Sequence, residues 1–570
     1  MFTDEEKKIL EKYVTSTEDN IFAIRNLQGM TGAAYARYSR AKGGFREVLL
    51  KEFIQDGNID PQHADELIAR VLVAYGDDSV GELEGAHVSF EKITMLAAKE
   101  IEDHRIGGSP IEQSTRYVLY DQKDSDGNWL YYKDPAILNS VFGKQYIETM
   151  DFIFQTYADL VAPLKDYFVN LKKLEEAEYD INGDGVKEKW ADLTDEKDQK
   201  NFKQTYNFDL RAKACDTLRA LLPVGTLTNV GMFANGRFYQ TVISNLMTHR
   251  LPEMHKIAEQ TSSALQSIIP QYIRRAKKDE YAEKYNQEMF TLAKRLFPNE
   301  KPEVPASLPD YQLMDFGEGL IFEKLKDQQL SPESISKAIQ EARDVEEIAT
   351  MLYPYTNVSL KTIRDKVGTM NAAEREEIIS TYIQKRENRR HRPGRGLEHG
   401  YSHNFDCVIN FGTYKDLQRH RMNTQQRQLF TTKIGFYMPE ELIVAGFEDK
   451  VIACLEKADQ LFDAMSKVDP EMAQYAVLHG HYIRWNIALN DRAAMHLLEL
   501  RSTPQGHPNY RLAAQAMHKL ISERSKWRGE MMKFVDHNDY YWSRADSEAK
   551  QRVKERQLDE KFGHSAATEE

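Results

Sequence analysis

The sequence predicts a helix-rich α+β protein made of two related domains. Three observations lead to this prediction: a length that allows several domains, long stretches with apolar residues at helical spacing, and polar motifs that recur in the same order in both halves. The chain has 570 residues, of which 41% are hydrophobic and 29% are charged. Such values are typical of a globular protein with an ample core.

The composition also limits the classes of function. A net charge of −13 argues against broad nucleic-acid binding, which needs a basic face, but allows a local arginine pocket for a small anion. The sequence contains no run of 18 apolar residues, and the charged start MFTDEEKKILEKY is unlike a signal peptide. Cys215, Cys407 and Cys454 lack C-x-x-C spacing, which fits a reducing compartment. We expect a cytoplasmic protein that binds neither a membrane nor a nucleic-acid polymer.

In the first half, most segments have apolar residues at helical spacing. Strands are predicted only next to a few turns. HVSFEKITM (87–95) fits either a strand or a helix, and GGSPIEQSTRYVLYDQ (107–122) is expected to be a loop followed by a strand. Asp124–Asn128 lies between aromatic runs, which predicts a hairpin. The expected helices cover residues 4–14, most of 20–50, 62–75, 96–105, 134–175 and 205–275.

The prolines of KRLFPNEKPEVPASLPDYQ indicate a linker near 297–309. We therefore expect a first domain over 1–296, a connector over 297–345 and a second domain over 346–570, with an insertion at about 120–205. Within this insertion, Asp180-Ile-Asn-Gly-Asp-Gly resembles the start of a calcium loop. However, Ala191 stands where a bidentate carboxylate is needed. A solvated acidic loop is the other interpretation, and we predict no metal site.

A group of polar motifs is repeated along the chain. Glu82 precedes Asp103-His104-Arg105 by 21 residues, and Glu398 precedes Arg419-His420-Arg421 by the same 21. Downstream, Asn235 and Arg237 match Asn490 and Arg492, and each pair is followed by an amphipathic helix. The ordered recurrence indicates duplication of a whole domain. Arg390-His391-Arg392 precedes Glu398 and is therefore not the equivalent motif.

The Arg419-His420-Arg421 motif has the chemistry of an anion site. Two permanently charged guanidinium groups suit phosphates or an electron-rich ring, and the imidazole can accept or donate a proton. A solvated basic turn is the simpler interpretation for an isolated motif of this kind. The repeated neighbourhood favours the binding site.

The order of the motifs resembles flavin-dependent thymidylate synthase in tandem copies. The shared features are a G-x-x-[ST]-x-x-E turn, a helix ending in R-H-R, an E-x-S-x-R-Y loop, an R-x-x-L-P segment, an N-x-R segment and a final arginine. They cover roughly residues 70–120, 205–275, 385–435 and 470–525. The resemblance implies two α+β domains with small antiparallel sheets.

Each half departs from the family pattern in a different place. The first half keeps the loop and Arg219, but has Asp103 for the first arginine of R-H-R and Leu246 for the final arginine. The second half keeps R-H-R and Arg501, but has Leu429 for the loop serine and Gln474 for the R-x-x-L-P arginine. This complementary loss predicts one composite pocket that both halves build.

The resemblance also implies the reaction and the roles of residues. The reaction is the reductive methylation of dUMP to dTMP, with FAD as cofactor and with methylenetetrahydrofolate and NADPH as co-substrates. Arg501 and Arg419 would be catalytic, with Glu398 orienting the flavin-binding group. The implied substrate-binding residues are Glu112, Gln113, Ser114, Arg116, Arg219 and Arg501, and the implied cofactor-binding residues are Glu398, Arg419, His420, Arg421, Asn490 and Arg492.

Several alternatives stay open from the sequence. The chain could act on another pyrimidine nucleotide, or be a catalytically inactive scaffold that binds nucleotide or flavin. Arg219 could be a helix-end cation, Asn490 and Arg492 a buried polar pair, and His496 an ordinary helix residue. We expect two chains to pair as a pseudo-tetramer of four domains, with the pocket forming within or between chains.

Overall fold

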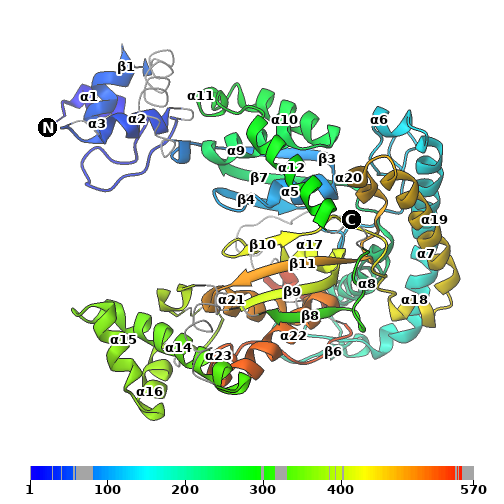
Figure 1. The fold of residues 1–570 in the computed structure, drawn as a ribbon. Coiled ribbons are helices and arrows are strands. Elements are labelled where there is room, and N and C mark those ends of the chain that lie inside the picture. Colours follow the sequence, from blue (N-terminus) through cyan, green and yellow to red (C-terminus); the bar gives the residue numbers. More distant parts are fainter. Residues whose placement is uncertain are drawn as a thin grey trace.

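The structure is a computed structural model. It describes residues 2–554 apart from 28–29, 40–41, 56–57, 60–80, 297–300, 315–329, 384–385, 390, 392, 401–402, 543, 546–547 and 550. The helix expected at 62–75 and two residues of the rejected Arg390-His391-Arg392 motif lie outside the described residues. Figure 1 shows two sheets at the centre, one above the other, with the long helices on one side.

The two sheets repeat one topology. In the first, the central strand β7 (Leu227–Asn235) lies antiparallel between β3 (Gly85–Thr94) and β4 (Gly108–Glu112). In the second, β11 (Tyr482–Leu489) lies in the same way between β9 (His403–Asn410) and β10 (Thr424–Arg427). The extra strand β8 (Asp310–Met314) pairs with β9 at the edge. The expected fold of two helix-rich copies with small antiparallel sheets is confirmed.

Equivalent polar residues start the equivalent helices. Asn235 accepts a hydrogen bond from the Phe238 amide at 2.8 Å and caps α9 (Gly236–Thr248). Asn490 accepts one from the Ala493 amide at 2.8 Å and caps α21 (Asp491–Arg501). Asparagine at this position satisfies an amide that would otherwise lack a partner. Thr94 and Asn410 do the same for α5 (Met95–Glu102) and α17 (Phe411–Leu417).

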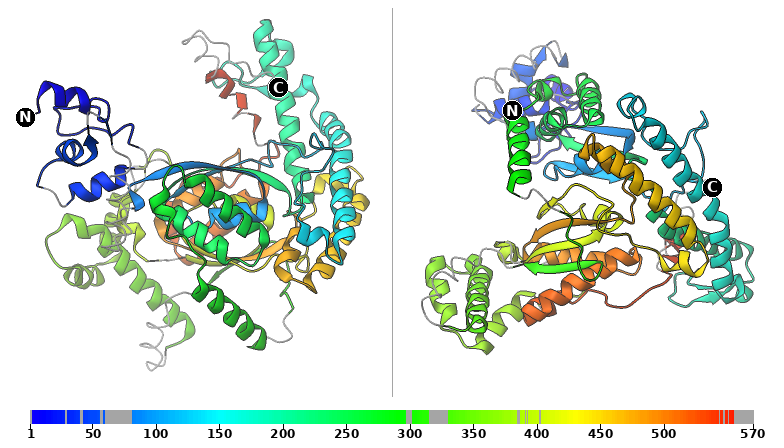
Figure 2. Two further views of the ribbon diagram at one scale, coloured as in Figure 1. Left: turned by 90° about the horizontal axis from the view of Figure 1, so that it is seen from above. Right: turned by 45° about the vertical axis from the view of Figure 1, so that its right-hand side comes forward.

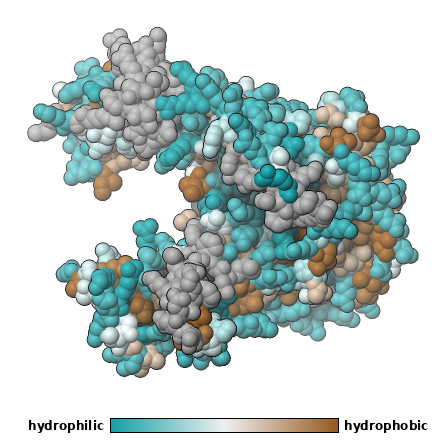
Figure 3. Space-filling model, viewed as in Figure 1, coloured by the Kyte–Doolittle hydropathy of each residue, from teal (hydrophilic) through white to brown (hydrophobic). Residues whose placement is uncertain are grey.

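The remaining elements surround this duplicated centre. The N-terminal helices α1–α3 and the helices α14–α16 extend from the same side of the molecule, and its surface is hollowed between them (Figures 1 and 3). The helices are α1 (Asp4–Leu10), α2 (Thr31–Tyr38), α3 (Phe45–Val48), α6 (Pro135–Leu138), α7 (Gly143–Leu171), α8 (Glu196–Leu218), α10 (Pro252–Leu265), α11 (Pro270–Ile273), α12 (Glu280–Leu296), α14 (Pro332–Leu352), α15 (Leu360–Gly368), α16 (Ala372–Ile383), α18 (Glu440–Val444), α19 (Glu448–Ser466), α20 (Pro470–Ala473), α22 (Pro508–Arg524) and α23 (Lys526–Met531). The short strands are β1 (Ile54–Gln55), β2 (Asn58–Ile59), β5 (Glu178–Tyr179) and β6 (Glu188–Lys189).

The two halves join through equivalent backbone segments. The Val224 amide donates to the Val477 carbonyl at 2.7 Å, and the His479 amide donates to the Leu222 carbonyl at 2.9 Å. These segments follow two short 3-10 helices, Arg219–Leu221 and Gln474–Ala476. Antiparallel pairing of like segments is what a two-fold axis between similar subunits produces. One continuous apolar core extends through both halves.

Three expected elements differ from the structure. The segment 205–275 was expected to be helical throughout but contains the central strand β7. LTNVGMFAN buries every second residue, which suits a strand. In 107–122 the strand β4 comes first and the turn follows. The turn at Asp124–Asn128 is present, with the Asp124 amide donating to the Asn128 carbonyl, but no strands flank it among the described residues.

The expected connector and the acidic loop that resembles the start of a calcium loop both have defined structures. β8 and the first part of α14 lie within 297–345, so part of the expected connector belongs to the second sheet. In the acidic loop, Asp180 accepts hydrogen bonds from the Gly183 and Gly185 amides at 2.6 and 3.1 Å. In the part of the chain that the structure describes, no cluster of three or more His, Cys, Asp or Glu residues could hold a metal ion. Nor is any helix there long and apolar enough to cross a bilayer.

His481, at the junction of the halves, gives a pH-dependent prediction. Its Nδ1 accepts from the Leu478 amide at 2.9 Å, and burial lowers the pKa of its imidazole to about 4. A lowered pKa makes stability fall as pH decreases from 6.5 towards 4, because the unfolded chain binds the proton first. In His481→Asn, we expect the loss of unfolding free energy between pH 7 and pH 4.5 to be smaller by roughly 2–3 kcal/mol. Equal losses in the two proteins, measured by denaturant titration, would contradict this.

Candidate functional site

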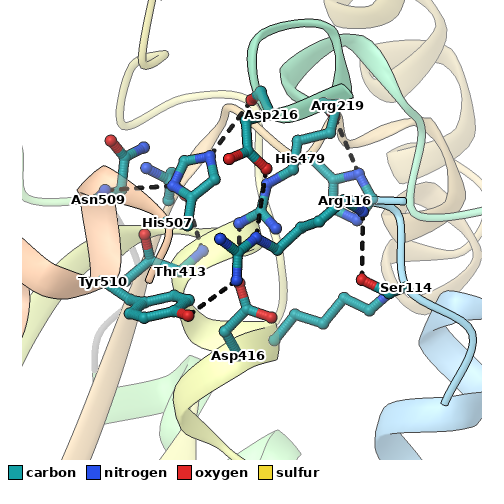
Figure 4. A network of polar contacts seen from close by, with 12 residues as sticks. Ser114, Arg116, Asp216, Arg219, Thr413, Asp416, His479, His507, Asn509 and Tyr510 are labelled. Atoms are coloured by element: carbon teal, nitrogen blue, oxygen red, sulfur yellow. Dashed lines mark hydrogen bonds and ion pairs between the residues drawn. The ribbon is translucent and has the colours of Figure 1, made fainter. Parts of the chain in front are cut away.

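The residues that the two halves retain lie together in one chain. A terminal nitrogen of Arg219 lies 3.0 Å from an oxygen of Asp416, and one of Arg116 donates to the Tyr510 hydroxyl at 2.8 Å. Arg116 and Arg219 belong to the first half, whereas Asp416 and Tyr510 belong to the second (Figure 4). The structure therefore brings retained residues of both halves into contact within a single chain, and their use as one composite pocket stays a prediction.

Local structure fixes the two first-half arginines. Arg116 follows β4, and its amide donates to the Ser114 hydroxyl at 3.3 Å. Arg219 begins the 3-10 helix after α8, and its carbonyl lies 3.1 Å from Nδ1 of His479 in the second half. Both side chains are buried, with 8% and 4% exposure. Gln113 lies beside this loop and accepts from the Asn229 amide group at 2.9 Å.

Asp416 is the electrostatic centre of the pocket. Burial opposes its ionisation, but the surrounding arginines outweigh burial and hold the pKa of this carboxyl well below its usual range. A carboxylate among several guanidinium groups stays charged at neutral pH. The arginines that act on it are Arg219, Arg116, Arg419 and Arg501.

A second carboxylate, Asp216 at the end of α8, was not recognised in the sequence. It lies 3.2 Å from Nε of Arg116, and both its oxygens accept from Arg544, at 2.5 and 2.7 Å. Burial would raise the pKa of Asp216, but Arg544 and Arg116 keep it well below its ordinary value. Five arginines thus face two aspartates, which leaves this group with a net charge of +3.

Arg501, the predicted final arginine, contacts the R-H-R motif. Its Nε donates to Nε2 of His420 at 2.9 Å, and its guanidinium carbon lies 5.4 Å from the ring centre of Tyr510. Burial and the charge of Arg501 hold the pKa of His420 well below its usual value. His420 is therefore a neutral acceptor. His496 packs edge-on against it, with ring centres 5.6 Å apart.

Another buried histidine, His507, contacts the backbone of Asp216. Its Nδ1 accepts from the Asn509 amide at 3.2 Å, capping α22, and its Nε2 lies 3.3 Å from the Asp216 carbonyl (Figure 4). Burial and nearby Arg219 hold the pKa of His507 well below its usual range. A neutral imidazole that donates from Nε2 satisfies both contacts. Since no motif marks His507, Tyr510 or Asp216, sequence reasoning missed them.

Glu112 lies in a buried charge cluster between the halves. Its carboxylate is within 3.0 Å of Lys99, 2.8 Å of Lys415 and 2.7 Å of Arg419. Burial opposes ionisation, but Lys415 and Lys99 hold the pKa of Glu112 well below its normal value. Glu102 also pairs with Lys99. In this geometry Glu112 orients Arg419, and its expected contact with substrate stays a prediction.

The remaining predicted cofactor residues form two groups. Arg421 donates to the Gly108 carbonyl and, at 3.2 Å, to the Ser109 hydroxyl of β4. Arg492 pairs with Glu398, and the Asn490 amide group donates to the Glu398 carbonyl at 3.4 Å. The same pair occurs in the first half, where Arg237 lies 2.6 Å from Glu82. The two halves thus keep this ion pair in common.

In the pseudo-symmetric counterpart region, the side chains bond to one another. Gln474 occupies the place of Arg219 and accepts from Arg427 at 3.3 Å and from the Phe430 amide at 3.1 Å. Arg427 also pairs with Glu100, and His104 lies 2.8 Å from Asn245. Among the described residues of this region, the buried arginine Arg427 is paired with the carboxylate Glu100. The asymmetry supports a single composite pocket.

Comparison with known proteins assigns the duplicated architecture. A family model described as thymidylate synthase complementing protein matches residues 28–271 and 335–525. The chain belongs to this family. UPF0159 proteins of Chlamydia pneumoniae and Chlamydia muridarum are 36% and 34% identical to it, over 96% and 97% of this chain and 97% and 99% of theirs. A UPF0159 protein of Thermoplasma acidophilum is 29% identical, over 92% of this chain and 98% of its own.

The match to the thymidylate synthase complementing family includes both sets of pocket arginines. Arg116 and Arg219 lie in the first matched segment, and Arg419 and Arg501 lie in the second. Arg544 lies beyond the second segment. One buried pocket residue therefore comes from a part of the chain outside the family match.

Proposed function

We propose that the protein is an FAD-dependent thymidylate synthase. It would methylate dUMP reductively to dTMP, using methylenetetrahydrofolate and NADPH. The observation that carries this proposal is the convergence of Arg116 and Arg219 from one half with Arg419 and Arg501 from the other around Asp416. A pocket with a net charge of +3 suits a phosphate dianion together with a pyrimidine ring that becomes electron-rich during the reaction.

The phosphate of the nucleotide would replace the acceptors that Arg116 contacts in the chain without ligand. The terminal nitrogens of Arg116 donate to neutral acceptors, the Tyr510 hydroxyl and, at 3.0 Å, the Gln505 carbonyl. A phosphate oxygen is a stronger acceptor than either. Ser114 and Arg219 would complete the phosphate contacts. Arg501 would lie at the pyrimidine edge, where its charge favours the anionic, more nucleophilic ring.

The donors of the second half fit a flavin dinucleotide. The Nε atoms of Arg419 and Arg492 are buried and have no hydrogen-bond acceptor among the residues that the structure describes. A pyrophosphate supplies acceptors of the kind that such donors need. Arg419, His420, Arg421, Asn490 and Arg492 would hold FAD, with Glu398 orienting Arg492. The bound flavin would supply the hydride-transfer chemistry, and the chain would supply binding and orientation.

The function is tested on the purified protein. We expect a yellow protein with flavin absorbance that converts dUMP to dTMP in the presence of NADPH and methylenetetrahydrofolate. If the protein shows flavin absorbance but converts another pyrimidine nucleotide to a different product, that nucleotide is the substrate in place of dUMP. Nucleotide binding without bound flavin or turnover would show an inactive scaffold instead.

The amount of flavin that each variant retains tests whether FAD binds to the second half and not to the first. Arg419→Ala and Arg421→Ala should each weaken FAD binding by roughly 1.5–3 kcal/mol, because each removes a charge-assisted contact. The matched control is Arg105→Ala, at the position equivalent to Arg421 in the first half. The flavin-to-protein absorbance ratio after gel filtration measures retention. Equal loss in all three variants would show that the two flavin regions are alike.

The quaternary structure follows from the duplication. We expect two chains to pair, so that four domains imitate a family homotetramer. Multi-angle light scattering should give twice the chain mass of 66.0 kDa. A stable monomer at micromolar concentration would contradict this prediction.

A further inference from the structure

The segment that follows α23 runs from the second half to residues 112–120 of the first half, which we call the nucleotide loop. We call the described residues within 532–554, which leave out 543, 546–547 and 550, the C-terminal strap. Figure 2 shows its red end beside the helical region drawn in cyan and teal. The strap lies outside both segments that match the family. Family motifs therefore assign it no role.

Both halves anchor the strap. In the second half, the buried side chain of Arg511 donates to the Asn538 and Tyr540 carbonyls at 3.0 and 3.2 Å. In the first half, Lys213 lies 3.7 Å from the ring centre of Tyr541, and Trp542 packs edge-on against Phe168. Tyr541 and Trp542 therefore fasten the strap to α8 and α7.

Arg544 is the strap residue that reaches the pocket. It is 3% exposed, pairs with both oxygens of Asp216, and donates to the Arg116 carbonyl at 2.9 Å. Its guanidinium carbon also lies 4.9 Å from the ring centre of Tyr117. One side chain thus holds the backbone of the nucleotide loop and the carboxylate that orients Arg116.

The charge of Arg544 has a consequence for substrate binding. Without it, Asp216 would have Arg116 as its one ion-pair partner among the described residues and would draw that guanidinium group away from the ligand. The net charge of the pocket would fall from +3 to +2. Sharing Asp216 between two arginines keeps Arg116 both oriented and able to attract an anion.

We propose that the C-terminal strap completes the nucleotide site and that Arg544 is the residue that positions Arg116. The ligand class, a pyrimidine nucleoside monophosphate, rests on the proposed function. The positioning role itself rests on contacts in the chain without ligand. It can therefore be tested separately from turnover.

The test compares Arg544→Gln with Arg552→Gln in the full-length protein. Arg552 lies on the same strap but contacts Gln204 and Glu548, away from the pocket. The first readout is amide hydrogen exchange of the loop 112–120 without ligand, where Tyr117 and Val118 donate to the Ser114 carbonyl. The second is the Kd for dUMP measured by calorimetry. Arg544→Gln should accelerate exchange and raise the Kd, each by about tenfold, while Arg552→Gln changes neither.

A double variant separates positioning from general stability. Asp216→Asn combined with Arg544→Gln restores the net charge of +3 and removes the carboxylate that would otherwise draw Arg116 away from the ligand, so we expect its Kd to return towards the wild-type value. Arg544→Lys keeps the charge but loses the two-pronged contact and should be intermediate. If Arg544→Gln does not fold, these two variants carry the comparison with Arg552→Gln.

The possible outcomes are distinguishable. Exchange in 112–120 that is the same in all the Arg544 variants and in wild type overturns the positioning role, whatever the nucleotide does. Faster exchange with an unchanged Kd, or a double variant no better than Arg544→Gln, also overturns it. If exchange responds but wild-type protein does not bind dUMP, the proposed function fails and the positioning role stands.

Discussion

Replacing Arg219 by Gln should lower kcat/KM for dUMP by at least about 30-fold, because losing one partner of a buried charge contact costs about 2–5 kcal/mol. Glutamine occupies the equivalent position, Gln474, in the second half, so the fold should accept it. Arg501→Ala should have an effect of similar size, since it removes the proposed contact with the pyrimidine. Steady-state kinetics with dUMP, on protein checked for flavin content, measures both effects.

Mixing the two variants locates the pocket. Arg219 and Arg501 approach the same carboxylate, Asp416, within one chain. Every pocket in a mixture of Arg219→Gln and Arg501→Ala chains therefore keeps one defect, and activity should not return. Recovery of activity would show that the pocket forms between chains.

The matched control lies in the counterpart region. Gln474→Ala changes the residue equivalent to Arg219, whose side chain accepts hydrogen bonds from Arg427 and from the Phe430 amide. We expect its kcat/KM to stay within a few-fold of wild type. A loss as deep as that of Arg219→Gln would show that both regions are in use, and the argument from complementary loss would be wrong.

Replacing Glu112 by Gln should destabilise the protein by roughly 3–5 kcal/mol, the usual cost of removing one partner from a buried ion pair. The Glu112 side chain is fully buried and contacts Lys99, Lys415 and Arg419. Without its charge, Glu102 still pairs with Lys99 and Asp416 still acts on Arg419, but Lys415 loses the carboxylate that it contacts. Denaturant titration without ligand measures the loss of unfolding free energy.

A second substitution that removes a nearby positive charge tests the same prediction more specifically. Adding Lys415→Met removes one of the cations and should recover more than half of the loss, because the charges become better balanced. The control, Glu148→Gln, breaks a surface pair with Lys144 in which both side chains are mostly exposed, so we expect no measurable change. If Glu112→Gln is as stable as wild type but binds dUMP weakly, Glu112 is a substrate ligand and not an internal anchor.

Spacing along the chain carried enough information to identify the duplication. Equivalent capping asparagines, Asn235 and Asn490, begin equivalent helices. Arg219 and Gln474 both begin a 3-10 helix, which confirms that the two positions correspond. Such features depend on a few neighbouring residues, because capping and hydrophobic periodicity act over one or two turns. The helix-rich α+β class and the pattern of losses could therefore be derived from sequence.

The local sequence pattern was insufficient to predict the central strand β7. Its alternating residues lie between α8 and α9, and the strand is completed only by pairing with β3 and β4 more than 100 residues earlier in the chain. Strand propensity depends on such cross-strand neighbours. The aromatic runs beside Asp124 show the converse, since they have strand-like composition but form no strand there.

The sequence by itself determined which arginines each half kept and which motifs were lost. Only the tertiary structure decided that these arginines lie near one carboxylate, Asp416, within a chain, that Glu112 is enclosed among lysines, and that Asp216 pairs with both Arg116 and Arg544. The hydrogen bond between Arg116 and Tyr510 joins residues 394 positions apart. A contact of this kind is set by how the two halves pack against each other, and residue spacing within either half carries no information about it.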